Sequence, residues 1–296
     1  MNLYYRIADH VVSVIVSSKS EVFDNLPAFS SFLYEPDSEE IVGRLLEISL
    51  EAELERPDEE THCFDWEGTR CSIFQEKEGY LVELVQIHTG RKELMRSTSD
   101  WREVKTTLRP GQADFGFFLS YFIMMSYSFA SASFKTLMMH ASVIESDGKG
   151  ILFLGKSGTG KSTHTGLWLK YMPGTSLLND DNPIVRLFPD GSVRVYGSPW
   201  SGKTPCYHNR SVPVAGFVRL KQAPENRLQR LAPAQAFAAL LPSCSNMVWD
   251  KKIHDSVCLT VAEIIPQSKV CLLNCLPNSG AVALSNTLIY ETSYSK

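Results

Sequence analysis

The sequence has little of what marks a nucleic-acid-binding or repetitive protein. Its formal net charge is −4 at pH 7, and no block of Lys and Arg stands out along its 296 residues. Proteins that bind nucleic acid usually carry clustered positive charge, so we expect no nucleic-acid partner. No internal repeat and no low-complexity tract is visible. With 44% hydrophobic and 21% charged residues, the composition predicts a globular protein with one large domain or two smaller ones.

The cysteines lack the pairing that a disulfide framework or a zinc site would need. They are seven in number: Cys63, Cys71, Cys206, Cys244, Cys258, Cys271 and Cys275. The number is odd and no C-x-x-C pair occurs, which argues against both kinds of site. His62 precedes Cys63, but no second pair of ligands follows at a suitable spacing. Reduced thiols fit a cytoplasmic protein, and cytoplasmic localisation is our expectation.

Long apolar runs are few. Arg6, Asp9 and His10 come too early in the chain for a signal peptide. The segment 115–134, FGFFLSYFIMMSYSFASASF, carries no charge and is long enough to cross a bilayer. It also contains serines and a glycine and lacks flanking Lys/Arg clusters, so we predict a buried helix and no membrane partner.

The apolar pattern of the first third predicts a strand-rich region. Residues 3–16 predict an opening strand and residues 62–87 predict short strands, whereas 36–60 fits either a helix or a strand. Polar residues then lead to the turn signal Pro110-Gly111, where we place a domain boundary. A smaller, strand-rich α+β domain is therefore expected over 1–111 and an α/β domain over 112–296. The first domain carries no cluster of His, Cys or Asp, which suits a docking or oligomerising role; a homo-oligomer is one expectation.

The second region alternates strands and helices around a glycine-rich loop. Strands over Leu137–Ile144 and Gly150–Leu154 are predicted to form a hairpin across Asp147-Gly148. After them we expect a helix over Lys161–Tyr171, strands over 175–180, 191–199 and 212–220, a helix over 232–242, a strand over 269–277 and a helix over 278–291.

The glycine-rich loop follows the apolar run ILFL and reads GKSGTGKST. Its residues are Gly155, Lys156, Ser157, Gly158, Thr159, Gly160, Lys161, Ser162 and Thr163. They fit the pattern G-x-x-x-x-G-K-[ST]. Glycines let the backbone turn back and aim amide groups at a phosphate, and the following helix adds the positive end of its dipole. Lys161 would reach the β and γ phosphates and Ser162 would ligate Mg²⁺, so the loop predicts binding of ATP and Mg²⁺.

Two adjacent carboxylates follow the next apolar strand. In SLLNDDNP, Asp180 and Asp181 stand where metal coordination and general-base work would place them beside a phosphate loop. An ordinary Asp-Asp-Asn-Pro turn is the alternative. His140 stands near the start of the predicted hairpin, where it could carry a proton near the phosphate. From the residues alone, a hydrogen-bonded histidine at a strand edge is the better interpretation of His140.

Other polar residues near these segments are less informative. Lys203, in GSPWSGKT, could contact an acceptor or a phosphate, or could be the solvated lysine of a tight turn; both interpretations stay open. We predict that His164 is a surface histidine of the helix after the loop. Arg219 and Lys221 share one face of a strand and are expected to be solvated.

The run HASVIESDGKGILFLGKSGTGKST, followed by LLNDD, resembles the C-terminal kinase domain of HPr kinase/phosphorylase. It is also similar to the nucleotide site of ATP-dependent phosphoenolpyruvate carboxykinase, which shares that fold. The distinctive feature is the antiparallel hairpin that enters the phosphate loop. The resemblance covers about 137–220, weakens toward the C-terminus and is absent over 1–110. It implies a phosphoenolpyruvate carboxykinase/HPr kinase-like P-loop domain with a mixed sheet.

The resemblance also implies roles for individual residues. His140 matches a histidine near the reacting phosphate, and Asp180 and Asp181 match the paired aspartates of the family. We assign Asp180 and Ser162 to the metal, and Asp181, with His140 and Lys161, to catalysis. After the aspartates this chain reads YGSPWSGKTPCYHNRSVPVAGFVRL, whereas HPr kinases have a signature with a glutamate and an Arg-Gly pair. The protein HPr is therefore not implied as the acceptor.

Three functions are compatible with these residues. The leading one is an HPr kinase-like phosphotransferase that uses ATP and Mg²⁺ to phosphorylate a hydroxyl of an unidentified acceptor, a protein serine or a small molecule. The second is a non-catalytic nucleotide sensor or scaffold. The third is a lyase like the carboxykinases, but the chain is too short for their organic-acid domain. ADP or pyrophosphate as the donor is left open.

Overall fold

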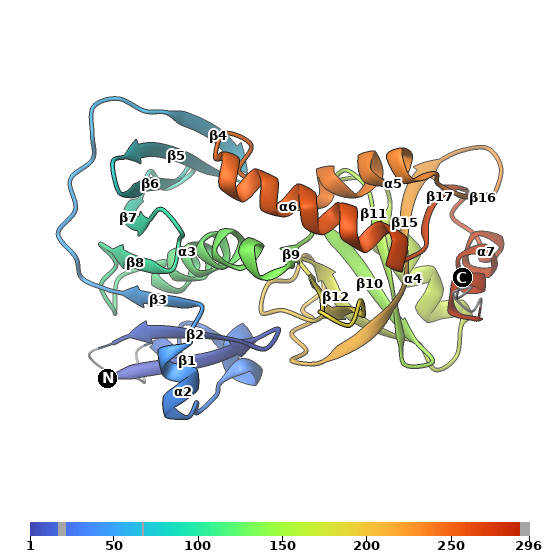
Figure 1. Cartoon of the computed structure of the whole chain (residues 1–296), viewed down its shortest axis with the longest axis horizontal. Helices are drawn as coiled ribbons and strands as arrows, with labels where there is room; N and C mark the ends of the chain where they lie inside the picture. The colour runs from blue at the N-terminus through green and yellow to red at the C-terminus, as the bar shows by residue number, and fades with distance from the viewer. Residues whose placement is uncertain (17–21, 67, 291–296) are drawn as a thin grey trace. The chain divides into compact units, whose positions relative to one another are not determined.

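The chain divides into two compact units, Met1–Ala130 and Ser131–Lys296, in a computed structural model that describes residues 1–16, 22–66 and 68–290 (Figure 1). The fold is mixed α/β, and each unit has a mixed sheet. The division follows Ala130 rather than the predicted residue 111. The reason is that the helix α3 (Phe115–Ala130) packs on strands of the N-terminal sheet and so belongs to the first unit.

In the described part of the N-terminal unit the strands form one sheet in the order β1-β2-β3-β8-β7-β6-β5-β4. The pairs β2–β3 and β3–β8 are parallel, and the others are antiparallel. The elements are β1 Asn2–Ile7, β2 His10–Ile15, η1 Pro27–Phe32, α2 Ser38–Val42, β3 Leu46–Ser49, β4 His62–Trp66, β5 Thr69–Glu76, β6 Gly79–Gln86, β7 Lys92–Thr98, β8 Glu103–Thr106 and α3.

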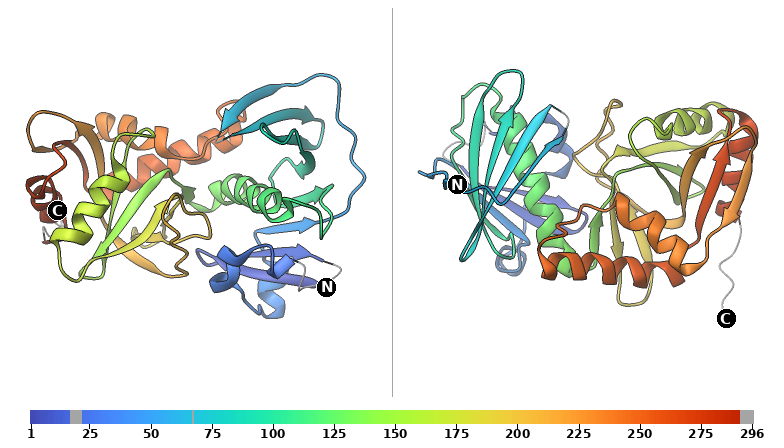
Figure 2. Two further views of the ribbon diagram at one scale, coloured as in Figure 1. Left: turned by 180° about the vertical axis from the view of Figure 1, so that it is seen from behind. Right: turned by 90° about the horizontal axis from the view of Figure 1, so that it is seen from above.

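The apolar segment forms the core helix of this unit. Figure 2 shows α3 running along one face of the N-terminal sheet. Tyr127 donates a hydrogen bond from its hydroxyl to the carbonyl oxygen of Ile7, 3.0 Å away, and 67% of the most apolar window of Phe115–Phe134 is buried. The length and composition of this segment also suffice for a membrane span. The predicted buried helix is confirmed, and localisation stays a prediction.

The opening strand is a hairpin, so the prediction of a single strand over 3–16 is wrong. Ala8 and Asp9 adopt φ values of 45° and 61°, and β1 pairs with β2 directly across them. Two left-handed residues in a row form the tight turn that suits the twist of antiparallel strands. Because neither residue is a glycine, the composition gave little sign of this turn.

In the described part of the C-terminal unit the main path of the sheet runs β12-β10-β11-β15-β14-β13-β9, with β17 beside β15 and β16 beside β17. The pairs β11–β15 and β15–β17 are parallel. The elements are η2 Ser131–Phe134, β9 Thr136–Met138, β10 Ala141–Ser146, β11 Lys149–Leu154, α4 Lys161–Tyr171, β12 Ser176–Asp181, β13 Ile184–Leu187, β14 Val193–Tyr196, β15 Ser211–Gln222, β16 Arg227–Arg230, α5 Pro233–Leu240, η3 Leu241–Ser243, α6 Lys251–Ile264, η4 Ile265–Gln267, β17 Val270–Cys275 and α7 Ser279–Tyr290.

The hairpin that enters the glycine-rich loop is confirmed. Asp147 and Gly148 have φ values of 47° and 69°, and β10 and β11 pair on either side of them. The predicted strand over Leu137–Ile144 is interrupted, however. β9 ends at Met138 and pairs with β13, whereas β10 begins at Ala141 and pairs with β11 and β12. His140 lies in the break, outside both ladders.

Helices α4 and α7 cover the sheet beside the loop and pack against each other. Their shared core contains Ile151 and Phe153 of β11, Trp168 of α4 and Leu288 of α7, all almost fully buried. The predicted helix over Lys161–Tyr171 is confirmed. The predicted last helix corresponds to α7, and residue 291 lies outside the described residues. This packing fixes the axis of α4 and therefore the direction of its N-terminus.

Two glycines of the C-terminal unit test the packing. A Cβ atom at Gly197 would lie 2.1 Å from the carbonyl oxygen of His208, whereas one at Gly166, on α4, would have no heavy atom within 4 Å apart from its neighbours and the backbone of its own helix. We expect Gly197→Ala to lower the free energy of unfolding by about 1–3 kcal/mol. Gly166→Ala should raise it by up to about 1 kcal/mol, because alanine is the better helix former. Urea denaturation measures both, and equal effects of the two changes would contradict the packing described here.

Candidate functional site

The glycine-rich loop turns sharply between β11 and α4. Gly158 and Gly160 adopt φ values of 78° and 105°, which L side chains rarely accept. Thr159 closes the turn by donating from its amide and its hydroxyl to the carbonyl oxygen of Lys156, at 3.1 and 2.7 Å. A Cβ atom on Gly155 would lie 2.9 Å from Thr159. The backbone conformation thus requires glycine at 158 and 160, and the close approach of Thr159 requires it at 155.

The residues of the loop alternate between exposed and buried positions. Three are exposed: Lys156, Ser157 and Gly158. Thr159 and Gly160 are partly buried, and Ser162 and Thr163 are exposed in the first turn of α4. The first amides of a helix have no carbonyl partner within the helix, so they are available to an anion.

Lys161 is the buried cation of the site, with only 8% of its surface exposed. Its Nζ donates to the carbonyl oxygen of Gly155 at 3.0 Å and lies 2.7 Å from Nε2 of His140. Burial lowers the pKa of Lys161, while the charges of Asp181 and Asp180 act in the opposite direction. The ammonium group is therefore held at the loop by partners of the loop and of the break before β10.

Asp180 faces the helix that follows the loop. It lies directly opposite Ser142 in the β10–β12 ladder and is 4% exposed. Its Oδ1 accepts hydrogen bonds from the hydroxyls of Ser142, at 2.8 Å, and Ser162, at 3.2 Å. The predicted metal pair, Ser162 and Asp180, is thus brought together by strand register and by the start of α4.

Asp181 faces the opposite side of the site. Its Oδ1 lies 3.3 Å from Nδ1 of His140, and its Oδ2 accepts from the side-chain amide of Asn182 at 2.8 Å. Burial raises the pKa of the Asp181 carboxyl, and the nearby Asp180 charge adds to this, while Lys161 opposes it. The two adjacent aspartates therefore have different partners, as is needed if one is to bind a metal and the other to act as a base.

His140 joins Lys161 to Asp181. Its backbone amide donates to the carbonyl oxygen of Ser243 at 2.7 Å, which holds the residue in the break between β9 and β10. With Lys161 protonated and Asp181 ionised, the neutral ring carries its proton on Nδ1 and accepts from Lys161 at Nε2. The three predicted catalytic residues thus form one chain of polar contacts, although they come from separate parts of the sequence.

The loop that carries Lys203 lies against the aspartates through its backbone. Ser201 forms an isolated bridge with Asp181, and the Gly202 amide donates to the carbonyl oxygen of Asp180 at 2.8 Å. A Cβ atom on Gly202 would lie 2.6 Å from that oxygen, so the close approach needs a glycine. Lys203 itself is exposed beside this contact. Its predicted role toward an acceptor or a phosphate stays a prediction.

The prediction of a surface position for His164 is wrong. The side chain is 3% exposed, and its ring packs against Phe153 with the centroids 4.6 Å apart. Its Nε2 lies 3.2 Å from the hydroxyl of Ser285 on α7. Burial lowers the pKa of His164 to about 4, so the ring is neutral near pH 7. The helix α7 covers His164, and the local sequence pattern around α4 gives no sign of this distant helix.

The same distant packing forms a hollow beside the loop. It has a volume of about 420 Å³ and is bounded by Gly160 and Thr163 on one side and by apolar residues of β15, α4 and the end of β17 on the other. Those apolar residues are Leu167, Leu220, Ala223, Cys275, Leu276 and Pro277. Gln222 also lines it and donates from Nε2 to the carbonyl oxygen of Thr159 at 3.3 Å. Sequence reasoning missed this hollow because its walls are distant in the chain.

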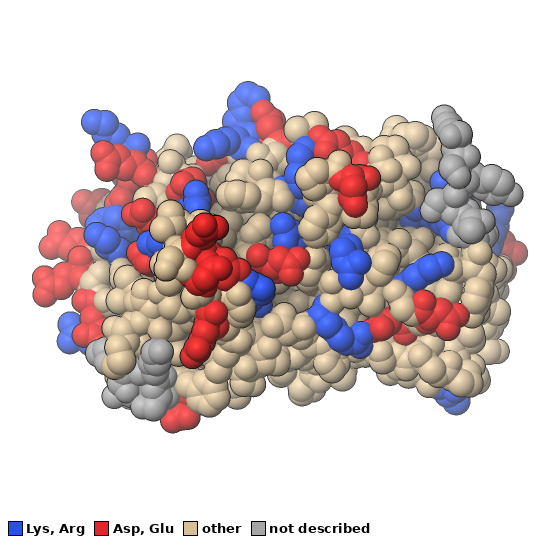
Figure 3. All heavy atoms as spheres, turned by 60° about the horizontal axis from the view of Figure 1, so that its bottom comes forward, with Lys and Arg blue, Asp and Glu red and all other residues tan. Residues whose placement is uncertain are grey.

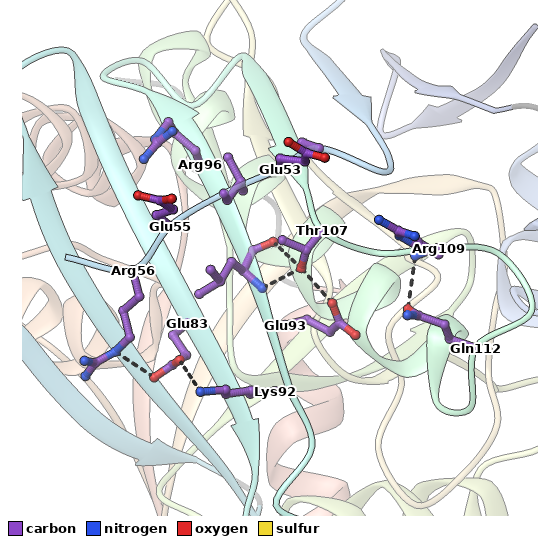
Figure 4. Close-up of a pocket in the computed structure, with 13 residues that line it drawn as sticks. Glu53, Glu55, Arg56, Glu83, Lys92, Glu93, Arg96, Thr107, Arg109 and Gln112 are labelled. Atoms are coloured by element: carbon purple, nitrogen blue, oxygen red, sulfur yellow. Dashed lines mark hydrogen bonds and ion pairs between the residues drawn. The ribbon is translucent and has the colours of Figure 1, made fainter. Parts of the chain in front are cut away.

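The N-terminal unit has a hollow of its own, of about 810 Å³, whose charged residues largely neutralise one another (Figure 4). Glu83 pairs with Arg56 at 3.1 Å and lies 3.8 Å from Lys92. Glu93 accepts from the hydroxyl of Thr107 at 2.6 Å, and Arg96 forms two hydrogen bonds with Glu76, which lies outside the hollow. These groups are satisfied internally, so the C-terminal unit holds the better candidate for chemistry.

The face that Figure 3 presents carries charges of both signs. Acidic and basic side chains are interspersed there among uncharged residues, and the coloured atoms of that view show no continuous basic area. The expectation that nucleic acid is not a partner rests on this distribution and on the net charge. It stays a prediction.

The residues around Asp180 suit a magnesium ion bound together with phosphate. Among the described residues, no group of three or more His, Cys, Asp or Glu side chains could hold a metal without help. One carboxylate and one hydroxyl that share a hydrogen bond, as Asp180 and Ser162 do, are the kind of donor set that Mg²⁺ uses when phosphate oxygens and water fill its other positions. The donor set therefore fits the predicted metal.

Part of the C-terminal unit is similar to a known protein family. Residues 119–263 are similar to a family described as "SynChlorMet cassette protein ScmC". This span includes His140, the glycine-rich loop, the two aspartates and Lys203, and it ends before β17 and α7. No curated protein matches the chain.

The hydroxyl of Ser285 links α7 to the helix that follows the loop. It accepts from Nε1 of Trp168 at 3.0 Å and lies 3.2 Å from Nε2 of His164. Ser285→Ala would leave these buried groups without their partner, so we expect the free energy of unfolding to fall by about 1–3 kcal/mol. Ser285 and, on α6, Ser256 each donate to the carbonyl oxygen four residues earlier, but the bond of Ser256 is exposed, so Ser256 is the matched control. Urea denaturation should show little effect of Ser256→Ala; a similar loss for both would contradict the linkage.

Proposed function

We propose that this protein is an ATP- and Mg²⁺-dependent kinase that transfers the γ-phosphate to a hydroxyl group of an acceptor, a protein serine or a small molecule. The observation that carries the proposal is the convergence of Lys161, His140 and Asp181 near the N-terminus of α4, with His140 within hydrogen-bond distance of both other residues. A phosphate loop alone indicates nucleotide binding. A polar chain from its lysine to a partly buried carboxylate adds groups that catalysis of phosphoryl transfer can use.

Each residue of the site has a role in this reaction. The amides of the loop and of the first turn of α4 bind phosphate oxygens, and the Lys161 ammonium neutralises charge on the β and γ phosphates. When bound at Ser162 and Asp180, Mg²⁺ stabilises the negative charge of the phosphates. Asp181 accepts the proton of the attacking hydroxyl, and its raised pKa makes it a better base than an exposed carboxylate.

His140 supports both ends of this arrangement. Its Nδ1 contact orients the Asp181 carboxylate, and its Nε2 contact places the Lys161 ammonium. The break between β9 and β10 lets the histidine leave the ladder and reach both groups. We propose that the C-terminal unit has the phosphoenolpyruvate carboxykinase/HPr kinase-like fold. The hairpin that leads into the loop and the mixed sheet support this assignment.

The hollow beside Gly160 and Thr163 is the proposed place of the nucleotide base. It opens next to the glycine-rich loop, and most of the residues that line it are apolar. An apolar wall suits a nucleotide base, because the flat faces of the base are themselves largely apolar. Leu276 is 38% exposed at this hollow and can be changed without opening the core.

Two substitutions test whether the site catalyses transfer. We expect Lys161→Ala to abolish both ATP binding and phosphate transfer, because the loop loses its cation. Asp181→Asn should keep ATP affinity within about threefold but lower the transfer rate about 10²–10⁴-fold, the usual contribution of a general base. Binding is measured by calorimetry, and transfer by incubation of the protein with radiolabelled ATP, Mg²⁺ and a fractionated cell extract.

Lys170→Ala is the matched control, since Lys170 is an exposed lysine of the same helix. It should leave both measurements unchanged. ATP binding without labelling of any fraction would favour a nucleotide sensor over a kinase. Failure of the unmodified protein to bind ATP would contradict the proposal as a whole.

The assignment of the base to the apolar hollow has a test of its own. Leu276→Glu places a charge at the hollow but not at the loop, so we expect it to weaken ATP binding at least tenfold and to leave binding of inorganic triphosphate within about twofold. Leu259→Glu, at an exposed leucine of α6, is the control and should change neither affinity. Equal weakening of both ligands by Leu276→Glu would show that the hollow is not the base site.

A further inference from the structure

Asp180 is held by two hydroxyl groups that come from different elements. Ser162 approaches from α4, on the side of the loop, and Ser142 approaches from the adjacent strand β10. Both donate to Oδ1. Within the part of the chain that the structure describes, no hydrogen bond or ion pair reaches the second oxygen of Asp180, Oδ2. One oxygen of the carboxylate is therefore fixed, and the other is left for a ligand.

Ser142 is a buried polar residue, and burying a hydroxyl is costly unless it forms a hydrogen bond. Its neighbours in the strand ASVIES are largely buried, and Ser142 itself is 1% exposed. Ser142 and Asp180 are direct partners in the antiparallel ladder, so their Cβ atoms are about 4.5–5.5 Å apart, and a hydroxyl can reach a carboxylate without leaving its strand. A strand-borne hydroxyl is more rigid than one on a loop, because the ladder fixes its backbone.

The two hydroxyls differ in what they do when a metal binds. Ser162 is a proposed metal ligand, so its oxygen must turn a lone pair toward the metal. Ser142, on the adjacent strand, has no such task. Its hydrogen bond can hold Oδ1 of Asp180 both before and after a metal binds. This fixes the rotation of the carboxylate and the direction of Oδ2.

We infer that Ser142 is a positioning residue for the metal site, and that it holds Asp180 with Oδ2 directed toward the ion that accompanies the nucleotide. This inference rests on the proposed function. Groups that orient a metal ligand commonly contribute 10–100-fold, as an order of magnitude, to metal affinity. The hydroxyl of Ser142 donates to Asp180 and not to the glycine-rich loop, so its effect should depend on the metal.

The experiment compares Ser142→Thr with Ser142→Val. Threonine and valine have nearly the same shape and differ by a hydroxyl in place of a methyl group, so any strain from the added atom is shared by both. The readout is equilibrium binding of a fluorescent ATP analogue, measured with Mg²⁺ and again in EDTA. Mn²⁺ binding to the nucleotide complex, followed by electron paramagnetic resonance, reports on the metal directly.

We expect Ser142→Val to weaken Mn²⁺ binding about tenfold or more. This variant should also lose most of the gain in nucleotide affinity that Mg²⁺ gives the wild-type protein. Its nucleotide affinity in EDTA should be unchanged. Ser142→Thr should retain at least half of the wild-type gain. Ser146→Ala is the control, since Ser146 is a buried serine of the same strand at its far end, and it should behave as wild type.

The outcomes separate this inference from the proposed function. If the wild-type protein binds the nucleotide with a gain from Mg²⁺, and the valine and threonine variants have equal Mn²⁺ affinities, Ser142 does not position the metal site. If the wild-type protein binds no nucleotide in either condition, the proposed function itself fails. Urea denaturation of the two variants confirms that both are folded, and a difference in metal binding between two folded variants of equal stability supports the inference.

Discussion

The candidate site depends on one buried cation and the groups that compensate it. A lysine with 8% exposure is costly unless hydrogen-bond acceptors and opposite charges surround it. Lys161 has the Gly155 carbonyl oxygen and His140 within hydrogen-bond distance, and two aspartates nearby. Truncating the lysine would leave the acids without their cation, and removing the acids would leave the cation without its countercharge.

The sheet supplies this compensation through strands that end near one another. β11 leads into the loop, β10 pairs with β11 on one side and β12 on the other, and β12 ends at Asp181. Register sets Ser142 opposite Asp180, and the break before β10 releases His140 toward Asp181. The helix α4 then presents its first amides beside these groups. An anion with several phosphate oxygens is the ligand that best matches such an arrangement, because it can accept from the amides and pair with the cation at once.

Local signals predicted those parts of the fold that local chemistry decides. The Asp147-Gly148 turn, the extent of α4 and the glycine positions of the loop follow from short-range requirements on φ and on hydrogen bonding. The hairpin over Ala8 and Asp9 was missed because its left-handed residues are not glycines. The helix α6 was missed although Asp250 caps it by accepting from the amide of Ile253, a signal that the sequence did contain.

The parts of the site that were not predicted depend on packing between distant segments. His164 is buried by α7, more than a hundred residues later in the chain, and the apolar hollow needs β15 and the end of β17. Ser142 was visible in the sequence as a hydroxyl beside apolar residues, but its partner follows only from the register of β10 and β12. The adjacency of Asp180 and Asp181 was visible in the sequence, whereas their opposite orientations were not.

The central claim is that the loop from Gly155 to Ser162 grips the phosphates of a nucleotide while Asp180 faces its metal. A crystal structure of the protein with Mg²⁺ and a non-hydrolysable ATP analogue tests it most directly. The account predicts phosphate oxygens within hydrogen-bond distance of the amides of Gly158, Gly160 and Lys161, with the ion beside Ser162 and Asp180. An analogue bound elsewhere, or a loop that stays empty at saturating analogue, would contradict it.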